Sequence, residues 1–171
     1  LILYSFVYTP MKKFGPIAVF IGAIPGALPP LIGWVASTGQ ITLEAIIIFS
    51  IQFIWQFPHF WAIGWLMFED YNRVGINMLP SGKRDRKTAL QAVLYSVWTL
   101  VISVFPVLGI TGSLQISIAA AILVALSGLG LIISAMRLYQ KLDHQAARQL
   151  MIVSVIYISW IQIIYVIDKL I

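Results

Sequence analysis

Two acidic residues stand at the end of a long apolar segment. Residues Trp55–Pro80 read WQFPHFWAIGWLMFEDYNRVGINMLP, so the apolar run leads directly to Glu69 and Asp70, followed by Tyr71 and Arg73. Carboxylates at the mouth of a membrane helix are costly unless a cation pairs with them. That cation would be a divalent metal held by this acidic pair, or a basic side chain that also binds an anion. The pattern predicts chemistry at a membrane surface.

Three polar residues lie deeper in the same segment. Gln52, Gln56 and His59 are spaced i, i+4 and i+7, so a helix would place them on one face, which continues to Asp70. Polar groups inside a bilayer point into protein or a wet cavity. We favour a cavity wall over the alternative, hydrogen bonds between helices. For His59 a helix contact, a general base and a ligand to a metal or heme all remain open.

An earlier charged loop would lie at the same membrane face, because two apolar spans separate it from the acidic pair. Mg²⁺ joins one or two carboxylates to phosphate oxygens, lysine adds a point charge and arginine a bidentate fork. Tyr8, Lys12 and Lys13 of this loop, with the acidic pair and Arg73, therefore predict a site for a magnesium-bound polyphosphate. The later basic residues are interpreted as ordinary solvated side chains: Lys83, Arg84, Arg86 and Lys87.

The composition excludes a soluble domain. Of the 171 residues, 60% are hydrophobic and only 10% are charged, and the mean hydropathy is +0.94. A soluble fold must keep a polar exterior, whereas this chain has apolar runs too long for barrel strands. The chain has no cysteine, so disulfides and thiolate metal sites are excluded. We interpret the net charge of +5 as loop asymmetry in a membrane protein rather than as nucleic-acid binding.

Five segments are long enough to cross a bilayer, which takes about 20 apolar residues. They follow a helix tail at Leu1–Tyr8 and are Gly15–Ala36, Leu43–Phe68, Thr88–Leu108, Leu114–Tyr139 and Ala147–Ile167. We expect an all-α, polytopic transmembrane helix bundle forming a single domain over residues 1–171. Pro25, Pro29 and Pro30 predict a kink or break in the first span.

The basic residues predict the orientation of these spans. With the five spans in place, ten of the eleven Lys and Arg residues fall on one face and Lys169 on the other. Loops rich in Lys and Arg stay on the cytoplasmic side. We therefore expect the predicted site to face the cytoplasm of a bacterial inner membrane, with the mitochondrial inner membrane as the alternative.

Three motifs together resemble a known family. They are YTPMKK at Tyr8–Lys13, IGAIPGALPPLIGW at Ile21–Trp34, and WQFPHFWAIGW at Trp55–Trp65 followed by EDYNRVGINMLP at Glu69–Pro80. They are similar to the protoheme IX farnesyltransferase (heme O synthase) family, within the UbiA-type intramembrane prenyltransferases. The resemblance implies nine transmembrane helices around a central cavity, of which this chain would hold the last five and the end of the fourth. It implies transfer of the farnesyl group of farnesyl diphosphate to a vinyl group of heme B, with Mg²⁺ as cofactor.

The resemblance also implies roles for individual residues. Tyr8 and Lys12 would correspond to a diphosphate-binding Tyr-x-x-x-Lys element, and the acidic pair to the second acidic motif, with Tyr71 and Arg73 alongside. The complete expected set is catalytic Asp70, Lys12 and His59, diphosphate-binding Tyr8, Lys12, Lys13 and Arg73, heme-side Gln52, Gln56 and His59, and metal-binding Glu69 and Asp70.

Two departures qualify this correspondence. Members of the superfamily often have a second aspartate four residues after the first, where this chain has Arg73 or Val74. The first acidic motif of the family is absent and would lie before Leu1. Because the chain begins with Leu1 rather than Met, we expect a C-terminal fragment that is inactive alone.

Two alternatives remain open at this point. One is a UbiA-type transferase acting on an aromatic quinone precursor, and the other is a membrane transporter or assembly subunit. For the leading hypothesis, a heme O synthase, the expected partners are farnesyl diphosphate, heme B, the lipid bilayer, and heme A synthase or oxidase assembly proteins. No nucleic acid is expected as a partner.

Overall fold

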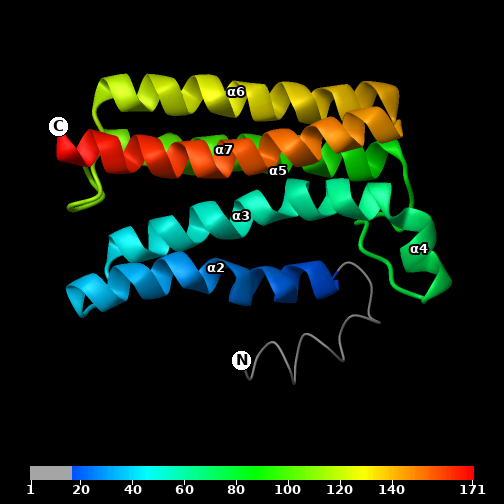
Figure 1. Ribbon diagram of the computed structural model, residues 1–171, viewed down its shortest axis with the longest axis horizontal. Coiled ribbons are helices and arrows are strands. Elements are labelled where there is room, and N and C mark those ends of the chain that lie inside the picture. The colour runs from blue at the N-terminus through cyan, green and yellow to red at the C-terminus, as the bar shows by residue number, and fades with distance from the viewer. Residues whose placement is uncertain (1–16) are drawn as a thin grey trace.

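The structure is a computed structural model that describes residues 17–171. Its elements are α2 (Ile17–Thr38), α3 (Leu43–Leu66), α4 (Phe68–Arg73), α5 (Arg86–Val104), the 3₁₀ helix η3 (Phe105–Leu108), α6 (Ile118–Lys141) and α7 (His144–Leu170) (Figure 1). Five of them are long and apolar enough to cross a membrane. The predicted fold class and the five predicted spans are confirmed, with bounds shifted by a few residues. The chain is an integral membrane protein.

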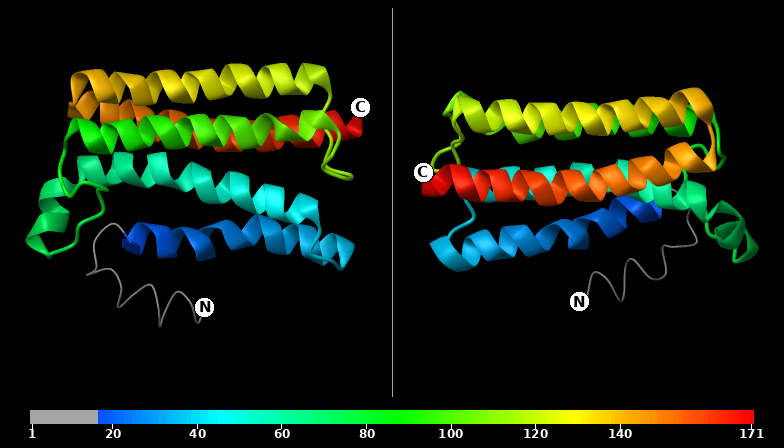
Figure 2. Two further views of the ribbon diagram at one scale, coloured as in Figure 1. Left: turned by 180° about the vertical axis from the view of Figure 1, so that it is seen from behind. Right: turned by 45° about the horizontal axis from the view of Figure 1, so that its top comes forward.

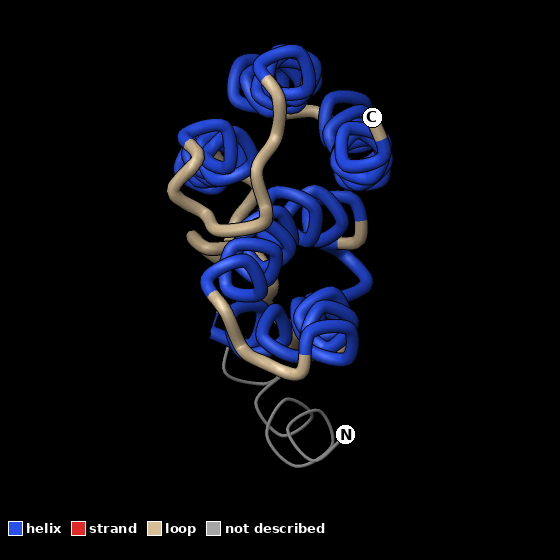
Figure 3. The backbone as a smooth tube through the Cα atoms, turned by 90° about the vertical axis from the view of Figure 1, so that its left-hand side faces the viewer, coloured by secondary structure: helices blue, strands red, loops and turns tan. Residues whose placement is uncertain are grey.

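The five long helices run alternately in opposite directions, with α3 at the centre (Figure 1). One side of α3 packs against α2, and the other packs against α5 and α7. Helix α6 covers α5 and α7 from outside. The end view therefore shows α2 and α6 at opposite margins of the bundle (Figure 3).

Aromatic side chains hold α3 in this central position. Trp55 Nε1 donates to the carbonyl oxygen of Ser154 in α7 at 2.6 Å. The rings of Phe57 and Trp61 lie 4.7 and 4.9 Å from the ring of Tyr95 in α5, measured between centroids. Aromatic pairs at these distances add stability beyond the area that they bury. These contacts hold α3 against α5 and α7. They therefore also set the position of the side chains on the opposite face of α3, which point toward α2.

Polar residues mark where three helices begin. Asp85, Ser117 and Asp143 precede α5, α6 and α7, and each side chain accepts a backbone N–H three residues later, at 2.9, 3.1 and 2.7 Å. An N-cap of this kind contributes about 1 kcal/mol because it satisfies a free N–H of the first turn. At the other end of α5 and η3, Gly109 has a φ of 71° and turns the chain.

Of the kink or break predicted for the first span, the structure shows no break in α2. The helix continues from Ile17 to Thr38 with Pro25, Pro29 and Pro30 inside it. Each proline removes one N–H donor, yet the remaining turns stay helical because α3 packs along them. Gln56 of α3 supports this contact by donating to the carbonyl oxygen of Ala23 at 3.0 Å.

The two ends of the bundle differ in charge. Helix α4, the start of α5 and the α6–α7 turn share one end, and the C-terminus lies at the other (Figures 1 and 2). The first end, called the basic end below, carries Arg73, Lys83, Arg84, Arg86, Lys87, Arg137, Lys141 and Arg148. Among the described residues, Lys169 is the one basic side chain at the opposite end.

Candidate active site

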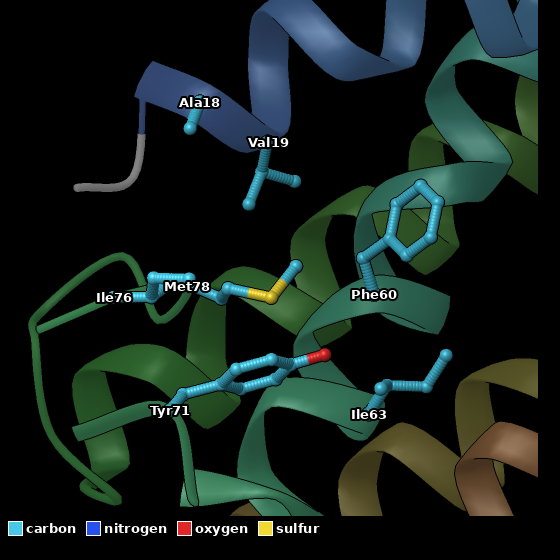
Figure 4. A pocket seen from close by; sticks show the side chains of 7 residues that line it. All are labelled: Ala18, Val19, Phe60, Ile63, Tyr71, Ile76 and Met78. Atoms are coloured by element: carbon cyan, nitrogen blue, oxygen red, sulfur yellow. The ribbon is translucent and has the colours of Figure 1, made fainter. Parts of the chain in front are cut away.

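A groove runs between α2 and α3 and reaches the basic end. Its outer part has a volume of about 240 Å³ and is lined by Ala18, Val19, Phe60, Ile63, Tyr71, Ile76 and Met78 (Figure 4). Its deeper part has a volume of about 310 Å³ and is lined by Val19, Gly22, Pro25, Gly26, Gln56, Phe60 and Met78. Val19, Phe60 and Met78 line both parts, so the two parts form one continuous space, called the α2–α3 groove below.

The segment after α4 closes the outer part of the groove. Met78 lies across it, and the next residue, Leu79, is buried with 1% of its surface exposed. Gly64 of α3 permits this close approach, since a Cβ there would lie 3.2 Å from both Met78 Cβ and Leu79 Cδ2. Tyr71 reaches in from α4, with its hydroxyl directed toward the space between Phe60 and Ile63 (Figure 4).

Gln56 is the polar residue of the deeper groove. Its side chain is buried at 3% exposure, and Nε2 donates to the carbonyl oxygens of Ala23 in α2 and Gln52 in α3 at 3.0 and 3.1 Å. Gly26 makes room for it, because a Cβ there would lie 2.1 Å from Gln56 Oε1. Gln56 therefore forms a hydrogen bond between two helices and also lines a cavity. Both interpretations of this residue from the sequence, a helix contact and a cavity wall, apply to it.

His59 and Gln52 point elsewhere. His59 Nδ1 lies 2.9 Å from Ser154 Oγ of α7, and its ring stacks on Trp55 with centroids 5.0 Å apart. Gln52 lines a small space of about 40 Å³ beside α7. Within residues 17–171, neither side chain lines the α2–α3 groove. The structure therefore divides the three predicted cavity-wall residues between two helix interfaces.

The acidic pair lies on α4, the helix that also supplies Tyr71 to the outer groove. Each carboxylate has an arginine partner: Glu69 Oε1 lies 3.2 Å from Arg84, and Asp70 Oδ1 lies 3.5 Å from Arg73. Both acids are exposed. These arginines are basic partners of the kind predicted for the two carboxylates. In the described part of the chain, no group of three His, Cys, Asp or Glu side chains converges on a metal position.

From the sequence, Arg84 is interpreted as an ordinary solvated side chain. The structure instead places it at the site. Its Nε donates to the carbonyl oxygen of Trp65 at 2.8 Å, close to the end of α3. The guanidinium also lies 4.9 Å from the centre of the Phe68 ring, besides pairing with Glu69. The loop carries no local signal for these contacts, because they join residues 15 to 19 positions apart.

A hydrogen-bond network holds the loop that carries Arg84. Ser81 Oγ donates to Asp85 Oδ1 at 2.7 Å, and Thr88 N–H donates to the same oxygen at 2.9 Å. Burial alone would raise the pKa of Asp85, but these bonds outweigh it and hold the pKa below its usual value of 3.8. The ionised carboxylate therefore stabilises both the loop and the start of α5.

Three expected diphosphate ligands, Tyr8, Lys12 and Lys13, lie outside the described residues. The chain enters α2 at Ile17, and Ala18 already lines the groove. The segment that carries these residues therefore connects, along the chain, to the groove.

The chain is similar in sequence to known proteins over nearly its whole length. The sequence profile of the UbiA prenyltransferase family matches residues 1–159. The chain is 54% identical over 98% of its length to the protoheme IX farnesyltransferase of Flavobacterium johnsoniae, and 50% identical over 99% to that of Christiangramia forsetii. The protein of the same name from Cytophaga hutchinsonii is 43% identical over 99% of the chain.

The aligned region covers 56 to 58% of these three relatives, so the chain spans little more than half of their length. No solved structure is a significant match to this chain. The profile match and the identities over nearly the whole chain show that it belongs to the UbiA prenyltransferase family.

Proposed function

We propose that the full-length protein transfers the farnesyl group of farnesyl diphosphate to a vinyl group of protoheme IX, giving heme O for heme-copper oxidases. The observation that carries the proposal is the apolar α2–α3 groove, whose outer part is lined by Tyr71, the residue that follows the acidic pair in α4. Relatives named for this activity, at up to 54% identity, support the choice of substrates. The chain described here would supply one wall of the active site.

The groove suits the isoprenoid chain of the donor. Ligand pockets are mostly apolar with a few polar groups that fix orientation, and they measure about 300–1,000 Å³. The two parts of the groove, about 240 and 310 Å³, are lined mainly by aliphatic and aromatic side chains. The farnesyl chain would lie along Val19, Phe60 and Met78, with its reactive carbon near Tyr71.

The basic end suits the diphosphate. Arg73, together with Tyr8, Lys12 and Lys13, would bind its oxygens, since arginine and lysine are the common ligands of phosphate. Asp70 and Glu69 supply hard oxygen donors, and Mg²⁺ needs only one or two carboxylates when phosphate oxygens and water complete its shell. The residues therefore fit a magnesium ion shared with the substrate. When bound, this ion would withdraw negative charge from the leaving diphosphate.

In the reaction, the bond between C1 of the farnesyl group and the diphosphate oxygen breaks, and diphosphate leaves with the electron pair. The vinyl π electrons of heme B form the new carbon–carbon bond. Water adds to the resulting cation and releases one proton, which leaves the hydroxyl group of heme O. Phe60, Ile63 and Ile76 would keep other water away from the allylic cation, because their side chains line the groove.

Roles for the remaining predicted residues follow from their positions. Gln56 would orient a substrate in the deeper groove, and Gln52 and His59 would lie on the heme side of α3. His59 has Ser154 as a hydrogen-bond partner, so it would act with that hydroxyl. The basic end would face the cytoplasm of a bacterial inner membrane or the corresponding mitochondrial face, and product would pass to heme A synthase or oxidase assembly proteins.

The full-length protein, expressed in cells that lack their own heme O synthase, tests the proposal. Hemes extracted from the membranes are separated by chromatography and identified by mass spectrometry. We expect the hydroxyethylfarnesyl derivative of heme B, reduced at least a hundredfold by Asp70→Asn at an equal protein level. Lys87→Gln, which removes an exposed charge of α5, is the matched control and should keep full product.

Two results would overturn parts of this proposal. Absence of heme O with the protein present, together with prenylation of an aromatic quinone precursor, would replace heme as the acceptor. Full product from Asp70→Asn would remove Asp70 from the metal site while leaving the reaction in place.

A further inference from the structure

Another pocket, which is lined by polar side chains, lies at the basic end, far from the apolar α2–α3 groove. It has a volume of about 530 Å³ and lies between the end of α6 and the start of α7. Arg137 and Lys141 of α6 and Arg148 of α7 line it, with Gln145 and Gln149 between them. Helices α6 and α2 stand at opposite margins of the bundle (Figure 3), so this α6–α7 pocket is separate from the site described above.

The three cations of the pocket are exposed and have no ion-pair partner among the described residues. Among residues 17–171 the two ion pairs both involve α4, and none involves Arg137, Lys141 or Arg148. Asp143, in the turn between the two helices, uses Oδ1 to accept the N–H of Ala146 at 2.7 Å. Three neighbouring positive charges without a carboxylate partner repel one another, so an anion between them would be stabilised.

Helix stability explains only part of this arrangement. Lys141 lies in the last turn of α6, where a cation interacts favourably with the helix dipole. Arg148 lies in the second turn of α7, near its N-terminus, where a cation gains nothing from the dipole. The helix dipole therefore does not account for the position of Arg148.

The floor of the pocket indicates what kind of anion would bind. Ile152 lines the pocket one turn deeper than Arg148 and is 45% exposed. The exposed apolar surface continues down both helices through Ile156, at 61% exposure, and Ile133, at 53%. A free phosphate would use only the cations, whereas a lipid would use the cations and this apolar strip together.

We propose that the α6–α7 pocket binds the phosphate of an anionic phospholipid, whose acyl chains lie along the exposed strip of α6 and α7. The two arginines would hold the phosphate oxygens as bidentate donors, and Lys141 would add a point charge. Gln145 and Gln149 would donate to the glycerol or headgroup oxygens. Basic pockets between helix ends at a membrane surface are sites of this type.

Native mass spectrometry of the full-length protein tests the site. The protein in detergent is mixed with equal amounts of phosphatidylglycerol and phosphatidylcholine, and the lipids that remain bound are counted. We expect at least a fivefold preference for phosphatidylglycerol, which the double variant Arg137→Gln/Arg148→Gln loses. Lys87→Gln removes one charge at the same end outside the pocket and should keep the preference.

Further arms separate the alternatives. A tenfold excess of inorganic phosphate should not displace the lipid, and displacement would mean a free-anion site instead. Equal retention of the two lipids by the unchanged protein, or the same loss in Lys87→Gln as in the double variant, would overturn the proposal. Unfolding temperatures within about 2 °C of one another, measured without lipid, show that the variants remain folded.

Discussion

At the scale of single residues, the two carboxylates of α4 differ in how firmly their partners are held. Arg84, the partner of Glu69, is 24% exposed and also contacts the Trp65 carbonyl oxygen. Arg73, the partner of Asp70, is 79% exposed and lies on the same short helix. An exposed pair of this kind is worth only about 0–1 kcal/mol. Asp70 is thus the carboxylate that would exchange its partner for a metal ion at the lower cost.

Arg84 acts in this picture as a positioning residue for α4. Arg84→Ala removes the bond to the end of α3, the contact with Phe68 and the pair with Glu69. In the full-length protein we expect the KM for farnesyl diphosphate to rise about tenfold, with a smaller fall in kcat. Arg84→Lys keeps the charge but lacks the Nε donor, so it should restore only part of this loss. Steady-state kinetics in membranes measure both constants, and an unchanged KM in Arg84→Ala would remove Arg84 from the site.

At the scale of the elements, the contact between α2 and α3 depends on Gly26. Gly26→Ala would place a Cβ 2.1 Å from the present position of Gln56 Oε1 and displace the side chain from its bond to Ala23. We expect a loss of about 1–3 kcal/mol, because a buried amide then lacks its partner. Thermal unfolding of the purified protein measures it.

Gly33 provides the control for this experiment. It lies in the same helix, and a Cβ there would meet nothing within 4 Å, so Gly33→Ala should be neutral or stabilising by up to about 1 kcal/mol. The double variant Gly26→Ala/Gln56→Ala should be less destabilised than the sum of its single variants. Additive effects would show that Gly26 acts independently of Gln56.

The loop that precedes α5 should respond to acid through Asp85. The pKa of Asp85 is lowered in the folded protein, so its contribution to stability is complete above the usual value of 3.8 and is lost as the pH falls below that value. Asp85→Ala should cost about 1 kcal/mol at pH 7 and progressively less at lower pH. Asp85→Asn, which keeps the cap without a charge, should remove the pH dependence. Amide hydrogen exchange of residues 86–89 at several pH values distinguishes these cases.

How far the sequence predicts these elements depends on the range of the interactions. The spans follow from local composition, and the start of α7 follows from Asp143, so both are readable along the chain. The divergence of Gln56 and His59 is not, because they are three residues apart on one helix and meet different neighbours, α2 and α7. Of the kink or break predicted for α2, the break is absent, and the helix continues through its three prolines with α3 packed along it.

At the scale of the whole molecule, the basic side chains gather at one end of the bundle, next to apolar helix surface. The α2–α3 groove and the α6–α7 pocket both open at the basic end, from opposite margins of the bundle (Figure 3). Both proposals require this end to lie at a membrane surface in contact with a diphosphate substrate and with anionic lipid. The orientation of the whole protein therefore decides whether substrate made in the cytoplasm can reach the acidic pair.

The orientation is testable with single cysteines, because this chain has none of its own. In a full-length protein without other cysteines, Lys87→Cys lies at the basic end, and Gln40→Cys lies in the turn between α2 and α3 at the opposite end. Both positions are exposed. With the basic end on the cytoplasmic side, a membrane-impermeant maleimide should label Gln40→Cys in intact cells and Lys87→Cys only after permeabilisation. The reverse pattern would place the acidic pair outside the cytoplasm and away from its proposed substrate.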